Sequence, residues 1–117
     1  MHEFSIAQSI MQIVLAEAER AEARKVLKVS LKIGDLTAVS PDSLSFCFEL
    51  LAKGTIAEDS TLIIEKVPIM GYCPHCKKVF SIEDNQYLCQ NCGNHKIELT
   101  TGRELQINHL EIEHETD

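Results

Sequence analysis

Residues 73–93 read CPHCKKVFSIEDNQYLCQNCG, and this stretch decides how the chain is organised. It contains two Cys-x-x-Cys pairs, Cys73 with Cys76 and Cys89 with Cys92, separated by twelve residues. Each pair forms a tight turn that offers two thiolates, and four thiolates complete the tetrahedral coordination of one ion. Because no coordination position stays open, the spacing predicts a closed zinc site with a structural role.

Two other uses of these cysteines are possible. The CPHC pair alone resembles the redox motif of thioredoxin-like proteins, but that motif opens a helix, whereas KKVFSI at 77–82 has the pattern of a strand. An iron site of the rubredoxin kind also uses four thiolates, and only metal analysis separates it from zinc. His75 and His95 flank the two pairs, and we expect both to be loop residues rather than ligands.

The cysteine-rich segment interrupts a larger domain. Residues 71–99 hold four of the five cysteines and have little apolar periodicity, so they need a cross-link to fold. Regular patterns resume only afterwards, in RELQINHLEIE at 103–113. We therefore predict a domain formed by residues 1–70 together with 100–117, and a zinc-binding domain inserted at 71–99.

The larger domain has the pattern of an α+β fold. Apolar residues recur every three or four positions over 3–24, which predicts an amphipathic helix. Ser40 and Pro41 suit the N-cap and first position of a second helix. Strands are predicted at 26–34, 61–70 and 103–113. The predicted fold is a small sheet of about three strands packed by two helices, with an inserted zinc-ribbon-like module.

Composition narrows the function classes. The chain has eleven basic and eighteen acidic residues, a formal charge of −7, which argues against a broad nucleic-acid surface. The start MHEFSIAQSI lacks the basic region of a signal peptide, and no apolar run is long enough to span a membrane. We therefore expect a cytoplasmic protein. Cys47 lies on the apolar face of the second predicted helix, and we expect it to be a small core residue. Neither a nucleophile–base pair nor a phosphate-binding glycine loop is visible, so we do not expect an enzyme.

The amino terminus offers a second set of metal ligands. In Met1-His2-Glu3, the terminal amine, the His2 backbone nitrogen and the His2 imidazole can chelate one ion through fused rings. Such a nitrogen set favours Ni(II) or Cu(II). On chemistry alone the default alternative is an ordinary histidine at the start of a helix, without a metal. Glu3 could add an oxygen ligand, and so could an acidic residue of the segment 34–42, either Asp35 or Asp42. Free α-amines and imidazoles titrate at about 7.7–8.0 and 6.5, so binding should weaken in mild acid.

The sequence resembles a known family over nearly its whole length. The MHE start, the stretch KIGDLTAVSPDSLSFCFELLAKGTIAEDSTLIIE, the paired CxxC motifs and the closing GRELQINHLEIE are similar to those of the hydrogenase nickel-insertion accessory proteins, the HypA/HybF family. The resemblance implies His2 as the principal nickel ligand, with the Met1 amine and Glu3 nearby. It also implies that Cys73, Cys76, Cys89 and Cys92 bind zinc.

The resemblance further implies a nickel metallochaperone, which binds Ni²⁺ as transient cargo and delivers it for maturation of [NiFe] hydrogenase. Its implied partners are a nickel-handling GTPase and the hydrogenase large subunit precursor, with no nucleic acid. Some relatives carry a histidine directly after a CxxC pair, where this chain has Lys77 and Gly93. The alternative function is a zinc-ribbon adaptor or nucleic-acid-binding module without a second metal.

Overall fold

The computed structural model describes residues 2–114 and contains two compact units. The first unit comprises Met1–Lys32, Val39–Glu65 and Gln106–Asp117, and the second comprises Ile33–Ala38 and Lys66–Leu105. The predicted insertion at 71–99 lies within the second unit, which also includes chain on both sides of it. The assignment of nickel to one domain and zinc to the other stays a prediction.

The elements follow one another along the chain as two helices, six strands and one short 3-10 helix within the described residues. Their bounds are α1 (Glu3–Arg20), β1 (Ala23–Gly34), η1 (Asp35–Thr37), α2 (Pro41–Ala52), β2 (Thr61–Val67), β3 (Met70–Cys73), β4 (Lys78–Ser81), β5 (Glu98–Thr101) and β6 (Leu105–His114). The strands form two three-stranded sheets, in the orders β2-β1-β6 and β4-β3-β5. The predicted α+β class is confirmed.

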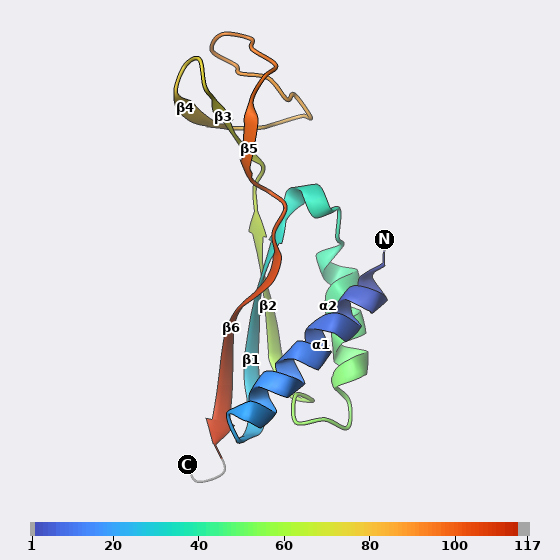
Figure 1. The fold of residues 1–117 in the computed structure, drawn as a ribbon. Coiled ribbons are helices and arrows are strands. Elements are labelled where there is room, and N and C mark those ends of the chain that lie inside the picture. Colours follow the sequence, from blue (N-terminus) through green and yellow to red (C-terminus); the bar gives the residue numbers. More distant parts are fainter. Residues whose placement is uncertain (1, 115–117) are drawn as a thin grey trace. The chain divides into compact units, whose positions relative to one another are not determined.

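In the first unit, both helices lie on one side of the sheet β2-β1-β6 (Figure 1). Strands β1 and β2 run in the same direction with α2 between them in sequence, whereas β6 runs the opposite way (Figure 1). Two parallel strands need a crossover connection, and α2 supplies it here. The core consists of apolar side chains from the helices and β1, and Leu44 and Phe48 of α2 are almost fully buried in it.

Helix α1 ends earlier than its pattern predicts. Its apolar stripe, Ala7, Ile10, Met11, Val14 and Ala18, is buried as the three- and four-residue spacing requires. However, the helix stops at Arg20 rather than Arg24, because Glu22 adopts a left-handed backbone with φ of 57°. The chain then turns directly into β1, which begins three residues before the predicted start.

Helix α2 begins where the sequence predicts. The Ser40 side chain accepts a hydrogen bond from the Ser43 backbone N–H at 3.3 Å, and Pro41 occupies the first turn. This is an N-cap followed by a residue that has no N–H to satisfy. The capped start places Asp42, one of the two candidate acidic ligands, in the first turn of α2.

The burial pattern of β1 departs from strict alternation near its start. Val29, Leu31 and Ile33 are buried at alternating positions, but this alternation does not continue to Leu27, which is 41% exposed, and Val26 is buried instead. The Val26 N–H donates to the Ile56 carbonyl at 2.9 Å, so this end of the strand is held by the loop after α2. This hydrogen bond joins residues that are far apart in sequence, and the alternating burial pattern is interrupted where it forms.

In the second unit, β3 pairs antiparallel with both β4 and β5. Pro68 separates β2 from β3, which divides the single strand predicted over 61–70 into two. Gly71 is buried in β3, where an added Cβ would lie 3.0 Å from the Phe80 ring. The register between β3 and β5 shifts between Met70 and Gly71. This small sheet carries the first cysteine pair at its end.

Two glycines of the second unit pack backbone against backbone. An added Cβ on Gly34 would lie 2.1 Å from the carbonyl carbon and oxygen of Gly102. The Gly34 N–H donates to the Glu104 carbonyl at 2.7 Å, and the Leu36 N–H donates to the Gly102 carbonyl at 2.8 Å. Only glycine permits this approach, which holds residues 33–38 against 102–104.

Within the part of the chain that the structure describes, no helix is long and apolar enough to cross a membrane.

Candidate metal centres

The four cysteines of the two CxxC pairs converge on one point. The Sγ atoms of Cys73, Cys76, Cys89 and Cys92 all lie within 4.8 Å of one another. Two of these separations, Cys73 to Cys92 and Cys76 to Cys89, are 3.8 Å. The cluster therefore joins cysteines that lie up to nineteen residues apart in sequence.

The two turns that carry these cysteines have the same local design. The residue after each pair, Lys77 or Gly93, has a positive φ of 56° or 75°. The N–H of that residue donates to the carbonyl of the first cysteine of the pair, Cys73 or Cys89, at 2.7 Å in both turns. Each turn thus bends the chain back, so that both thiols of a pair face one point.

The donor set fits a zinc ion. A regular tetrahedron with Zn–S bonds of about 2.3 Å has sulfur–sulfur edges of about 3.8 Å. The Cys73–Cys92 and Cys76–Cys89 separations match that edge. The Cys76 backbone N–H approaches the Cys73 Sγ at 3.4 Å, and the Asn91 side-chain amide donates to the Cys76 Sγ at 3.3 Å. Such donors stabilise thiolates, so the site is compatible with a closed structural zinc.

The thiols affect one another's ionisation. Hydrogen bonding from the Cys92 backbone N–H, with further help from Asn91, lowers the pKa of Cys89 to about 7. The Asn94 backbone N–H lowers the pKa of Cys92, but desolvation and the neighbouring sulfur atoms outweigh it and raise that pKa to about 12. Without a cation, four adjacent thiols cannot all ionise at neutral pH, and a divalent ion removes this obstacle.

The two nearby histidines stay outside this cluster. His75 and His95 are both exposed, and the group of potential ligands found within residues 2–114 contains the four cysteines alone. This agrees with the expectation that they are loop residues.

His2 is accessible, and the neighbouring Glu3 makes a contact that the sequence did not reveal. His2 is exposed and precedes α1, and its carbonyl accepts the Ile6 N–H at 3.0 Å. The Glu3 Oε2 accepts the Ser40 backbone N–H at 3.0 Å, across thirty-seven residues. This hydrogen bond is the main cause that lowers the pKa of Glu3. Met1 lies outside the described residues.

The two acidic candidates, Asp35 and Asp42, have different surroundings. Asp35 pairs with Lys66 at 3.4 Å within the second unit. Asp42 is exposed in the first turn of α2, two residues after the Ser40 N–H that binds Glu3. Of the two, Asp42 is the one that belongs to the same unit as α1.

These features define a small α+β protein with a four-thiolate metal module and an exposed amino-terminal histidine. Residues 1–112 match the family model described as "Hydrogenase/urease nickel incorporation, metallochaperone, hypA". The chain belongs to this HypA family, which confirms the resemblance and the predicted function as a nickel metallochaperone for hydrogenase maturation. Membership of this family also confirms nickel as the metal that the protein handles. The four-cysteine cluster is compatible with a structural zinc ion.

Individual relatives agree over nearly the full length. The chain is 42% identical to the hydrogenase maturation factor HypA of Nostoc punctiforme, covering 97% of this chain and 96% of that protein. It is 41% identical to the same factor of Geobacter metallireducens, over 97% and 100%. The solution structure of the Ni metallochaperone HypA from Helicobacter pylori matches with a TM-score of 0.69 and 26% identity, over 98% and 100%. The curated relatives are named as maturation factors, not catalysts.

Proposed function

We propose that this chain binds Ni(II) through the Met1 amine, the His2 backbone nitrogen and the His2 imidazole, and passes the ion on. The observation that carries the proposal is the exposed His2, placed directly before a helix whose first residue is tethered to Ser40. Because the His2 side chain is exposed, a ligand set that includes it can be reached by solvent and by a second protein. Accessibility of this kind suits cargo that must be released.

Glu3 completes the proposed site through its carboxylate. The Ser40 N–H donates to Oε2, and the Glu3 backbone N–H also donates to this carboxylate, so the group is held in place beside His2. Because these hydrogen bonds lower the pKa of Glu3, the carboxylate stays charged over a wider pH range. Asp42, close in sequence to Ser40 and exposed, is the candidate for a further oxygen ligand.

The zinc module serves a different purpose in this proposal. Cys73, Cys76, Cys89 and Cys92 hold a resident zinc with all four positions filled, so this site takes no cargo and performs no catalysis. The non-enzymatic role, the cytoplasmic location, the partner GTPase that handles nickel and the hydrogenase large subunit precursor as recipient are parts of the same proposal. They rest on the family to which the chain belongs.

The test is a calorimetric titration of zinc-loaded protein with Ni(II). His2→Ala should lose the amino-terminal binding event, and Glu3→Gln should weaken it. Glu19→Gln is the matched control, because Glu19 is an exposed carboxylate on the same helix. Equal nickel affinity in wild-type and His2→Ala proteins would exclude His2 as a ligand.

A further inference from the structure

Arg103 differs from the other arginines of the chain. The sequence has three arginines. Arg20 pairs with Glu17 at 2.8 Å and Arg24 pairs with Glu113 at 3.9 Å. The Arg103 guanidinium has no ion pair or hydrogen bond within residues 2–114, although the chain as a whole is acidic. An acidic protein that leaves one arginine unpaired has a cation available for an external anion.

Two carboxylates of the second unit, from Glu104 next to Arg103 and from Asp35 next to Leu36, have other partners. The Glu104 Oε1 accepts the Gly102 backbone N–H at 2.8 Å. The Asp35 carboxylate pairs with Lys66 at 3.4 Å. Neither contact involves the guanidinium, so neither of these carboxylates occupies it.

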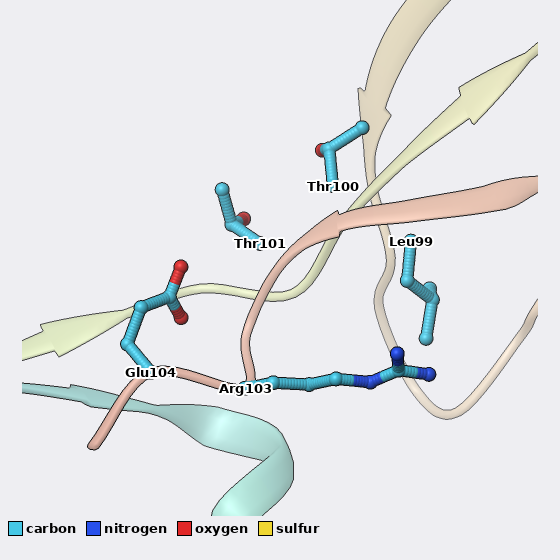
Figure 2. A pocket seen from close by; sticks show the side chains of 5 residues that line it. All are labelled: Leu99, Thr100, Thr101, Arg103 and Glu104. Carbon is cyan, nitrogen blue, oxygen red and sulfur yellow. The ribbon is translucent and has the colours of Figure 1, made fainter.

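Arg103 and Leu99 line two neighbouring hollows of the second unit, each with a volume of about 270 Å³. Thr100 and Thr101 also line the first hollow, and Leu36 also lines the second. Figure 2 shows the Arg103 side chain extending toward the side on which Leu99 lies, whereas the Glu104 side chain lies away from Leu99, on the side of Thr101. A cation beside leucine side chains suits a ligand that carries both an anion and an apolar group.

The threonines favour a carboxylate over a phosphate. The Thr100 hydroxyl donates to the Met70 carbonyl at 3.3 Å, and the Thr101 hydroxyl donates to the Pro68 carbonyl at 2.7 Å. Both hydroxyl protons are therefore used within the protein. A phosphate needs several donors around its oxygens, whereas one guanidinium fork satisfies both oxygens of a carboxylate.

The backbone that presents Arg103 is held on both sides. The preceding residue, Gly102, accepts the Leu36 N–H through its carbonyl at 2.8 Å. The following residue, Glu104, accepts the Gly34 N–H through its carbonyl at 2.7 Å. Binding at Arg103 then costs little backbone ordering, which is the main advantage of a preformed site.

The charge distribution between the units points the same way. The second unit has five basic and five acidic residues, whereas the first has six basic and thirteen acidic residues. Four thiolates and a zinc ion (−4 and +2) give the second unit a formal charge of −2, against −7 for the first, so an acidic ligand is repelled less by the second unit.

We propose that Arg103 and the two hollows beside it bind a carboxylate-bearing peptide segment of a partner protein. The guanidinium takes the carboxylate in a bidentate pair, and Leu36 and Leu99 contact an apolar side chain next to it. This site goes beyond the proposed nickel delivery and requires no nickel at the amino terminus. It assigns part of partner recognition to the second unit.

The test uses the full, zinc-loaded, nickel-free chain labelled with ¹⁵N for NMR. The probe is the acetylated, amidated tetrapeptide Leu-Glu-Glu-Leu, and the control peptide has Gln in place of Glu. The Glu peptide should shift the Arg103 Nε–Hε signal together with the Leu36 and Leu99 amides. Loss of one charge-assisted pair, in Arg103→Gln or with the Gln peptide, should weaken binding by roughly tenfold. Lys96→Gln, which removes another exposed cation of this unit, should bind like wild type.

Three results would overturn the proposal: equal shifts with both peptides, shifts of equal size around Lys96 and Arg103, or tighter binding of inorganic phosphate than of the Glu peptide. Arg103→Lys keeps the charge without the fork and should bind with intermediate affinity. It provides a folded comparison if Arg103→Gln loses zinc. Because nickel is absent, failure here leaves the assignment of His2 untouched.

Discussion

Removal of zinc should unfold the second unit and leave the first one folded. Seventeen apolar or cysteine side chains are buried among residues 2–114, and thirteen of them belong to the first unit. The second unit buries only Ile33, Ile82, Cys73 and Cys89. Two of these four are candidate zinc ligands, so the core of this unit largely consists of its metal site.

The free energy of apolar burial in the second unit is much smaller than that of zinc binding, and this difference predicts the outcome. Complete burial of an isoleucine stabilises by about 1.5–3 kcal/mol, so Ile33 and Ile82 together contribute about 3–6 kcal/mol. A structural zinc in a small module contributes an apparent 10–16 kcal/mol, roughly twice to five times as much. Without the ion, the two isoleucines cannot offset the conformational entropy of the ordered loops.

The assay is a ¹H–¹⁵N spectrum recorded before and after treatment with a strong zinc chelator under reducing conditions. Amide signals of residues 66–105 should collapse to the dispersion of an unfolded chain, and signals of α1 and α2 should stay in place. Cys89→Ser should give the same spectrum without chelator, whereas Cys47→Ser should not. A second unit that keeps its dispersed signals after quantitative zinc loss would refute the metal-dependent fold.

Three further predictions concern single residues. Gly34→Ala should destabilise the second unit by about 3–5 kcal/mol in urea unfolding, because the new Cβ meets the Gly102 carbonyl at 2.1 Å and breaks two backbone hydrogen bonds. The control is Gly54→Ala, whose new Cβ has nothing within 4 Å. It should cost only about 1–2 kcal/mol, because Gly54 has a φ of 80°. Phe48→Ala should cost about 3–5 kcal/mol, whereas Phe46→Ala, 62% exposed, should cost less than about 0.5 kcal/mol. The hydrogen bond from the Ser40 N–H lowers the pKa of Glu3, so the stability that this bond contributes is present above the ordinary carboxyl pKa and is lost as pH falls through the lowered value. The chemical shift of the Ser40 amide should follow this titration. A pH-independent shift, or the same titration in Glu3→Gln, would contradict the prediction.

Local signals in the sequence predicted much of this fold. Ser40 and Pro41 mark the start of α2 because capping depends on neighbouring residues only. The spacing of the CxxC pairs predicted the convergence of four thiols, because each tight turn aims its own two sulfur atoms. The apolar stripe of α1 was equally readable, since helical periodicity follows from the backbone itself.

Contacts between distant residues were not predictable. The bond between Glu3 and Ser40 and the close packing of Gly34 on Gly102 join positions thirty-seven and sixty-eight residues apart, and neither has a local pattern. The early end of α1 depends on the left-handed turn at Glu22, a residue that does not favour such a conformation by itself. Tertiary packing decides the first two contacts, and it is absent from any short window of sequence.

The measurement that tests the account most directly compares Ni(II) binding by two zinc-loaded proteins, one with a free Met1 amine and one in which that amine is acetylated. Acetylation removes the terminal amine as a ligand but leaves every side chain, including His2, in the protein. We predict that the acetylated protein loses at least about tenfold in nickel affinity and keeps its zinc and its fold. Unchanged nickel affinity in the acetylated protein would contradict the account, because it would exclude the terminal amine as a ligand.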